Sequence, residues 1–196
     1  MGKAAVTRKV ILTKAFDLIY QKGYQSTSVD NILAQTHVTK GAFYYHFENK
    51  EDMGVKMVEE VIYPKLYDAL ILPLEESEDP INDIFQVIMN FFKLADYQTI
   101  MYGCPTNNMI QEMAPLSDRF HEALKKITDT WQGTIEEAIK RGQQAGNVNR
   151  TVDPESVAQF IIVSYEGLRS LGKVYQFKLY YKNYLKQLRA YLSSLK

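Results

Sequence analysis

Apolar residues recur along almost the whole chain at the three- and four-residue spacing of amphipathic helices. The first such set falls at positions i, i+3, i+4 and i+7 and consists of Leu12, Ala15, Phe16 and Ile19. We predict a helix over residues 4–22 that ends at Gly23, because glycine readily adopts the left-handed conformation that closes a helix. No segment alternates apolar and polar residues as a strand does, so the pattern predicts an all-α protein.

Two short helices and a turn should follow the first helix. Thr27 and Asp30 have the spacing of a capping box, which predicts that a short helix starts there. Residues 36–39 predict a tight turn in which Thr39 is the N-cap of a second short helix over residues 40–47. Two short helices joined by such a turn form a helix-turn-helix.

Longer helices should occupy most of the remaining chain. Their predicted spans are residues 50–72, 80–97, 117–145, 154–177 and 181–195, with a further short helix that ends at Met113. Asp79-Pro80 and Asp153-Pro154 each supply an N-cap followed by a proline at the first helical position. Pro64 should kink or divide the helix in which it lies. The total is about nine helices.

The charge of the chain is unevenly distributed, although the formal net charge is zero. Residues 1–50 contain seven Lys or Arg and three Asp or Glu, so this segment carries +4 and the rest of the chain −4. A basic segment that contains a helix-turn-helix is suited to contact with the phosphates of DNA. The sequence therefore favours double-stranded DNA as a partner of this segment.

The chain lacks the sequence signals of a secreted or membrane protein. Arg8 and Lys9 interrupt the N-terminal segment, which therefore lacks the apolar core of a signal peptide. The richest apolar stretch, residues 157–171, contains Glu166 and Arg169 and falls short of the roughly 20 residues that span a bilayer. We therefore expect a cytoplasmic protein with no membrane partner.

Three segments of the N-terminal part resemble a known family. They are residues 27–32 (Thr-Ser-Val-Asp-Asn-Ile), 38–47 (Val-Thr-Lys-Gly-Ala-Phe-Tyr-Tyr-His-Phe) and 49–51 (Asn-Lys-Glu). Together they closely resemble the DNA-binding signature of the tetracycline-repressor (TetR) family. Leu33 departs from that signature, which often has alanine there, and should alter packing rather than DNA contact. The rest of the chain resembles a familiar type of TetR regulatory domain. This resemblance is carried by Gly103-Cys104-Pro105, Trp131, Gly146 and Asp153-Pro154.

The resemblance implies two domains and a function. Residues 1–49 would be a helix-turn-helix DNA-binding domain, and residues 50–196 a helical regulatory domain with a ligand pocket and a dimer interface. The protein would be a ligand-responsive transcriptional regulator, in this family usually a homodimeric repressor that a small molecule releases from a palindromic operator. Two alternatives stay open: a helical ligand-binding protein, or a cofactor-free enzyme, with a vestigial helix-turn-helix.

Candidate DNA contacts lie in the two short helices and just after them. Lys40 is suited to guanine O6 and N7, and Thr39 to a base or a phosphate. Gly41 is suited to close approach, because a glycine inside a helix costs about 1 kcal/mol relative to alanine. The family pattern adds the residues that lie at phosphates, so the predicted set is Thr27, Ser28, Thr39, Lys40, Gly41, Ala42, Tyr44, Tyr45, His46 and Lys50. The alternative is a packed helical hairpin. We predict that Phe43, Phe47 and Val38 lie in the core.

The effector predicted from the resemblance is small and largely apolar. Soft and aromatic side chains suited to an apolar pocket are Met89, Phe92, Met101, Tyr102, Met109, Met113, Phe120, Trp131, Phe160 and Tyr165. Each of them is also compatible with an ordinary hydrophobic core.

The last two predicted helices carry the signal for a second copy of the chain. Apolar residues of the final helix alternate steps of four and three, and the helix before it has small residues that permit close approach. In the TetR family these helices form a four-helix dimer interface. The predicted interface residues are Ser164, Gly167, Leu168, Leu171, Tyr181, Leu185, Leu188 and Leu192. Packing within a single chain is the alternative.

The remaining candidate chemistry is sparse. Cys104, the single cysteine, precedes Pro105 at a predicted helix start, where the helix dipole would favour a reactive thiolate; packing or capping is the alternative. His37, His46 and His121 are too scattered for a metal motif. We therefore expect no metal, no cofactor and no catalytic residue.

Overall fold

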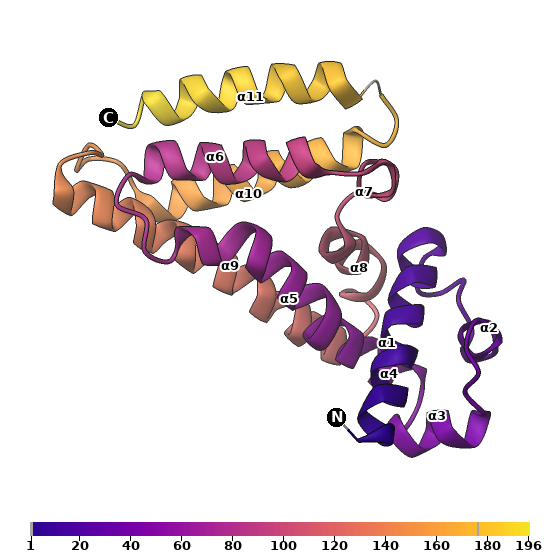
Figure 1. Cartoon of the computed structure of the whole chain (residues 1–196). Coiled ribbons are helices and arrows are strands. Elements are labelled where there is room, and N and C mark those ends of the chain that lie inside the picture. Colours follow the sequence, from indigo (N-terminus) through magenta and orange to yellow (C-terminus); the bar gives the residue numbers. More distant parts are fainter. Residues whose placement is uncertain (1, 176) are drawn as a thin grey trace. The chain divides into compact units, whose positions relative to one another are not determined.

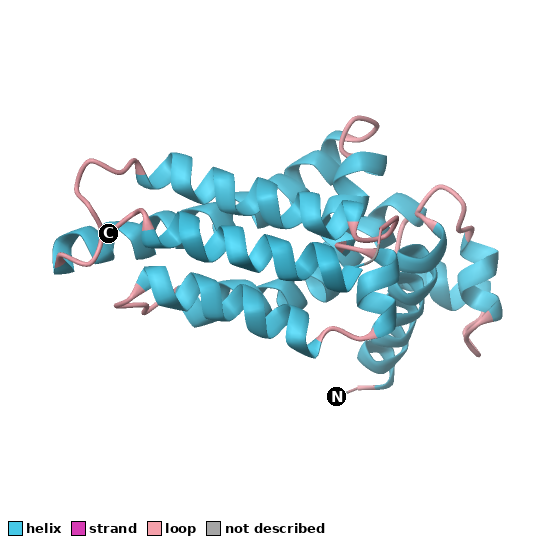
Figure 2. Ribbon diagram, turned by 90° about the horizontal axis from the view of Figure 1, so that it is seen from above, coloured by secondary structure: helices cyan, strands magenta, loops and turns pink. Residues whose placement is uncertain are grey.

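The computed structural model describes residues 2–175 and 177–196, which form helices joined by turns and loops (Figure 1, Figure 2). No strand occurs among these residues, so the predicted all-α fold is confirmed. The chain divides into two compact units, the first of residues 1–65 and 105–126 and the second of residues 66–104 and 127–196. The predicted functional division at residue 49 stays a prediction.

The first unit combines the N-terminal helices with helices from later in the chain. Its N-terminal helices are α1 (Lys3–Lys22), α2 (Val29–Ala34), α3 (Lys40–His46) and α4 (Lys50–Met57). The later ones are α8 (Pro105–Met113) and the start of α9 (Asp118–Ala145). They bury a common apolar core that includes Ile11, Leu12, Ala15, Ile32, Phe43, Phe47, Met53, Met57 and Phe120.

The helical run that begins with α4 continues to Leu74 and changes its winding on the way. It passes through a π-helical turn (η1, Val58–Ile62), one α-helical turn (α5, Tyr63–Leu66), a second π-helical turn (η2, Tyr67–Ile71) and a 3₁₀ turn (η3, Leu72–Leu74). The wide turn before Pro64 has a direct cause, because proline lacks an N–H and crowds the carbonyl four residues earlier. The helix predicted over residues 50–72 is therefore present. Pro64 does not divide it, and the winding changes in the π-helical turns before and after α5.

The second unit is a packed set of longer helices. It contains α6 (Pro80–Leu94), α7 (Tyr97–Tyr102), the rest of α9, α10 (Pro154–Leu171) and α11 (Phe177–Ser193). Helix α11 lies along α6 and α10 (Figure 1). As predicted, Asp79 and Asp153 cap α6 and α10, since their carboxylates accept from the amides of Asn82 and Ser156, each at 3.2 Å.

Two boundaries in the second unit differ from the prediction. Helix α7 was not predicted, and it begins where the Asp96 carboxylate accepts from the amide of Thr99 at 2.7 Å. Helix α10 ends at Leu171 rather than near residue 177, because Gly172 leaves room for the ring of Phe177. A Cβ at Gly172 would stand 2.8 Å from Cδ2 of that ring. The chain therefore turns early, and α11 begins four residues before its predicted start.

Within the described part of the chain, no helix combines the length and the apolar composition required to cross a bilayer.

Candidate DNA-binding site

The loop between α1 and α2 is held by the side chain of Thr27. This residue is buried, and its hydroxyl donates to the carbonyl oxygen of Gly23 at 2.8 Å. The capping box starts one residue later than predicted: Ser28 Oγ accepts from the amide of Asn31 at 3.1 Å, and Asn31 Oδ1 accepts from the amide of Ser28 at 2.9 Å. The predicted box of Thr27 and Asp30 is therefore wrong, because the Thr27 hydroxyl is already used inside the unit.

Helix α3 has the geometry of a recognition helix with one buried face. Thr39 is its N-cap, as predicted, since its hydroxyl accepts from the amide of Ala42 at 3.2 Å. Phe43 and Phe47 are fully buried with their ring centroids 5.4 Å apart, which fixes the inner face of the helix. Val38, which we expected in the core with them, is only partly buried.

The opposite face of α3 brings most of the predicted DNA contacts together at the surface. Thr39, Lys40 and Gly41 are exposed, and Ala42 and His46 are partly exposed. Tyr44 and Tyr45 leave 51% and 78% of their surface in solvent, although large aromatic residues gain most by burial. Ser28 is exposed at the start of α2, whereas Thr27 turns away from the surface. A short helix that exposes hydroxyls, a lysine and two tyrosines around an open glycine is suited to a DNA groove.

The two predicted lysine contacts have different surroundings. The ammonium group of Lys40 lies 3.3 Å from Asp30 Oδ1, and both side chains are exposed, so this ion pair is weak and easily exchanged for a contact with DNA. The ammonium group of Lys50 instead donates to the carbonyl oxygen of Tyr24 at 2.7 Å and lies 4.1 Å from the centroid of its ring. Burial lowers the pKa of Lys50, whereas the charge of Glu112 raises it.

Glu112 holds the loop between α1 and α2 in place, which the sequence did not reveal. Its carboxylate accepts from the amides of Tyr24 and Gln25 at 2.8 and 2.6 Å, so α8 holds the backbone that leads from α1 into α2. Burial raises the pKa of Tyr24, with smaller contributions from Glu51 and Glu112. Phe120 packs edge-on against the same ring at a centroid distance of 5.0 Å. The only sequence signal was a carboxylate at the end of a short amphipathic helix, which is too common to assign.

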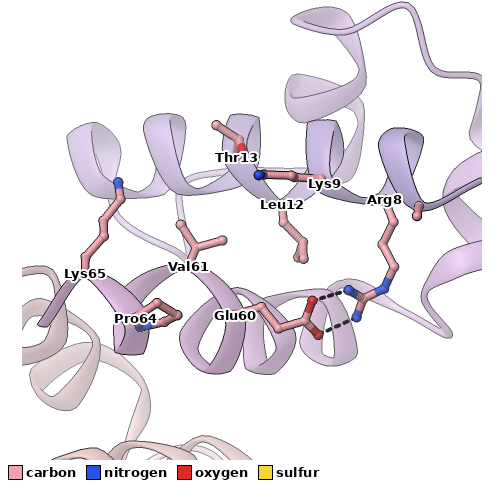
Figure 3. Close-up of a pocket in the computed structure, with 9 residues that line it drawn as sticks. Arg8, Lys9, Leu12, Thr13, Glu60, Val61, Pro64 and Lys65 are labelled. Carbon is pink, nitrogen blue, oxygen red and sulfur yellow. Dashed lines mark hydrogen bonds and ion pairs between the residues drawn. The ribbon is translucent and has the colours of Figure 1, made fainter. Parts of the chain in front are cut away.

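Helix α1 is joined to the segment around Pro64 by charged side chains (Figure 3). The guanidinium group of Arg8 makes two hydrogen bonds to the carboxylate of Glu60, one of them at 2.7 Å, and this contact raises the pKa of Arg8. The ammonium group of Lys65 lies 3.8 Å from the ring centroid of Phe16. Between these contacts is an open groove with apolar and basic walls.

The predicted ligand residues are divided between the two units. Phe92, Trp131 and Tyr165 come together in the second unit, where the ring of Tyr165 lies 5.5 Å from Phe92 and 5.3 Å from Trp131. Met89 and Tyr102 are partly buried in this unit, and Met101 and Phe160 are exposed on it. The other three, Met109, Met113 and Phe120, are buried in the first unit.

The predicted dimer residues differ in their availability. Leu168, Leu188 and Leu192 are buried within the chain itself, so their side chains are not available to a second copy. Ser164, Gly167, Tyr181 and Leu185 are partly exposed, and Leu171 is exposed. The alternating stripe of α11 packs at Leu188 and Leu192 against its own unit, because α11 lies along α6. Exposed apolar residues that the sequence did not single out are Val163, Val174 and Leu179.

Taken together, the fold and the exposed face of α3 define a helix-turn-helix DNA-binding protein with an attached helical unit. Comparison with known proteins agrees. Residues 11–55 match the family model of bacterial regulatory proteins of the tetR family, and residues 80–188 match the model of the tetracyclin repressor-like C-terminal domain. The chain belongs to the TetR family.

Named relatives support the same function. The transcriptional repressor DhaR of Mycobacterium sp. (strain GP1) is 29% identical over 82% of this chain and 79% of its own length. The transcriptional regulator AcuR of Cereibacter sphaeroides is 28% identical over 84% of this chain and 75% of its own length. A TetR-family regulator from Cytophaga hutchinsonii shares the fold, with a TM-score of 0.88 at 21% identity over 100% of this chain and 98% of that one. The chain is therefore a DNA-binding transcriptional regulator of this family.

Lys40→Ala is expected to reduce discrimination between operator and random DNA by about 1 to 3 kcal/mol, because a lysine paired with guanine reads the base. Lys50→Ala is expected to weaken binding to both DNAs by a similar factor, because Lys50 fixes the loop at Tyr24 rather than reading a base. Titrations of both variants with operator and random DNA over a salt series would measure this difference. An equal loss of discrimination in the two variants would show that the roles are wrongly assigned.

Proposed function

We propose that the protein acts as a cytoplasmic homodimer that binds a pseudo-palindromic operator through α3 of each copy. In this proposal the protein represses until a small, largely apolar molecule binds the second unit and releases it from DNA. The observation that carries the proposal is the exposed surface of α3, with Thr39, Lys40 and Gly41 at its start and Tyr44 and Tyr45 in its C-terminal half. Base edges are read by Lys40 and Thr39, and phosphates are bound by Ser28, Tyr44, Tyr45 and His46.

The surface proposed for the dimer lies mainly on α10. Phe160, Val163, Gly167 and Leu171 recur at helical spacing, and the three apolar side chains are 49%, 70% and 51% exposed. A Cβ at Gly167 would meet no atom within 4 Å, so another helix has room to approach there. An apolar stripe of this kind gains free energy when a second copy covers it. We propose this surface in place of the part of the predicted interface formed by Leu168, Leu188 and Leu192, because those three residues are buried within one chain.

The proposed effector site is in the second unit, around Phe92, Trp131 and Tyr165. Aromatic side chains with a few polar neighbours are typical of sites for small molecules. A ligand can release the protein from DNA only if it binds the DNA-free conformation more tightly than the DNA-bound conformation. A typical coupling free energy of about 1 to 3 kcal/mol changes operator affinity by about 5- to 150-fold. No enzymatic step is required by this function.

Val163→Glu is expected to convert the protein to a monomer at micromolar concentration and to reduce operator affinity by more than about tenfold, because both half-sites must be bound together. The matched control is Leu116→Glu, since Leu116 is 64% exposed and lies in the first unit. Sedimentation with and without operator DNA measures the oligomeric state. Footprinting should show two protected half-sites whose centres are about one turn of the DNA helix apart, or roughly 34 to 36 Å. A wild-type protein that stays monomeric both free and on operator would contradict the proposal.

A further inference from the structure

The second unit contains a group of polar side chains that the proposed function does not use. We define the Glu166 cluster as Cys104, Glu166, Arg169 and Lys173. The buried thiol of Cys104 hydrogen-bonds to the Glu166 carboxyl group. The other carboxyl oxygen, Oε2, is buried and has no hydrogen-bond partner in the described part of the chain. Such atoms are rare in folded proteins, because a buried acceptor without a donor is costly.

Arg169 fixes the wall of this cluster. Its side chain is buried, and its guanidinium group donates to the hydroxyl of Tyr165 at 2.9 Å, to the carbonyl oxygen of Thr99 at 3.3 Å and to that of Gly103. The same group lies 4.7 Å from the ring centroid of Phe91. These contacts join α6, the end of α7 and α10. They hold the Arg169 side chain in a fixed position inside the second unit.

Gly103 explains how the loop with Cys104 approaches α10. Its φ of 71° lies in the left-handed region that side chains other than glycine avoid. A Cβ at this position would stand 2.2 Å from Cε of Lys173 and 3.0 Å from the carbonyl oxygen of Arg169. The absent side chain therefore allows the loop to bring the Cys104 thiol to Glu166.

The charges in the cluster favour an uncharged ligand. Burial raises the pKa of Glu166, whereas the Cys104 thiol, Arg169 and Lys173 lower it. Burial of part of its side chain also lowers the pKa of Lys173, which is otherwise exposed. An ammonium ligand would meet Arg169 and Lys173, and a carboxylate ligand would meet Glu166. A neutral donor instead satisfies Oε2 without adding a charge.

An aromatic wall lies beside the cluster. Tyr165, the neighbour of Glu166 on α10, is fully buried, and its ring centroid lies 5.3 Å from Trp131, 5.5 Å from Phe92 and 5.8 Å from Phe91. An apolar or aromatic ligand body is therefore suited to this region.

We infer that Glu166 is the polar anchor of the effector site, and that the effector is an uncharged molecule with an apolar or aromatic body and a hydroxyl or amide N–H that donates to Glu166 Oε2. This inference rests on the proposed function, in which the effector binds the second unit. It names both the anchoring residue and the chemical class of the ligand.

The test uses the full-length protein and four probes of similar size: benzyl alcohol, benzyl methyl ether, benzylamine and benzoate. Trp131 is the only tryptophan of the chain and contacts Tyr165, so its fluorescence reports on occupancy. Benzyl alcohol is expected to bind about tenfold more tightly than its methyl ether, because only the alcohol donates a hydrogen bond to the buried carboxyl group. Benzylamine and benzoate are expected to bind more weakly than benzyl alcohol.

Glu166→Leu is expected to remove the preference for the alcohol while the affinity for the ether is retained. Its melting temperature is measured in parallel, because the substitution also removes the Cys104 hydrogen bond and the negative charge near the buried Arg169. Glu155→Leu is the matched control on the exposed start of the same helix and should keep the preference. If Glu166→Leu does not fold, Glu166→Gln tests the same point and should show a reduced preference.

Three results would overturn the inference. They are equal affinities of the wild-type protein for the alcohol and the ether, no binding of either up to the solubility limit, and a preference that survives in Glu166→Leu. Operator titrations with benzyl alcohol separate this inference from the proposed release mechanism. If benzyl alcohol binds with the expected preference over the ether but leaves operator affinity unchanged, the proposed release mechanism is contradicted. The role of Glu166 as the anchor of the ligand would still be supported. Release by benzyl alcohol that is equally strong in Glu166→Leu would support release and contradict the anchor.

Discussion

Gly41→Ala is expected to stabilise the folded protein while it removes most of the affinity for operator DNA. A Cβ at Gly41 would meet no protein atom within 4 Å, so alanine fits the free protein. Alanine inside a helix is favoured over glycine by about 1 kcal/mol, which should raise the melting temperature. In the complex the same methyl group would occupy the space that the DNA requires, and we expect operator affinity to fall by about tenfold or more, or at least about 1.4 kcal/mol.

The matched control for this variant is Gly133→Ala. Gly133 lies inside α9, and a Cβ there would also meet no atom within 4 Å. This control should gain similar stability and keep the operator affinity of the wild-type protein. Thermal unfolding and operator titrations of both variants check the two effects separately. Wild-type operator affinity in Gly41→Ala would show that Gly41 does not approach the DNA.

Gly54→Ala is expected to destabilise the first unit by about 1 to 3 kcal/mol, the usual cost of overpacking a core. A Cβ at Gly54 would stand 2.6 Å from Cζ of Phe120 and 2.7 Å from Cε2 of Tyr24. Both rings belong to a packed edge-to-face pair and have little freedom to move aside. Because Tyr24 also accepts the hydrogen bond from Lys50, its displacement should weaken operator binding as well.

A second substitution tests whether the contact with Phe120 causes the loss of stability in Gly54→Ala. Phe120→Leu shortens the side chain that the new methyl group would strike, so the double variant Gly54→Ala with Phe120→Leu should lose less stability than the sum of the two single variants. Urea unfolding of the four proteins gives this comparison. Strict additivity would mean that the contact with Phe120 is not the source of the strain.

The local signals of the sequence predicted most of the helices. Asp79-Pro80 and Asp153-Pro154 mark the starts of α6 and α10, because a capping carboxylate and a proline act within one turn of the chain. The N-cap of α3 at Thr39 follows from the same local chemistry. At the start of α2 two adjacent hydroxyl residues compete, and the tertiary contact of Thr27 with Gly23 decides between them. That contact is not encoded in the spacing of the capping box.

Features that depend on packing between distant segments could not be predicted. Glu112 meets Tyr24 and Gln25 across more than eighty positions of the chain. The side of α11 that faces inward depends on α6, so the apolar stripe at Leu188 and Leu192 could not distinguish packing within one chain from packing between two copies. Glu166 was counted only as a charge that interrupts an apolar stretch. The loop at Gly103, which packs closely against Arg169 and Lys173 of the same cluster, is more than sixty residues away in the sequence.

The first unit is not a continuous piece of the chain, and this affects how such regulators are recombined. Residues 1–65 meet α8 and the start of α9 through Glu112, which accepts from two backbone amides, and through Phe120, which covers Gly54. A chimera that grafts only the N-terminal helices onto another regulatory domain would leave those amides without their acceptor. To exchange DNA specificity between relatives, it is therefore better to replace only the exposed residues of α3. The remaining N-terminal helices then keep the α8 and α9 of their own chain.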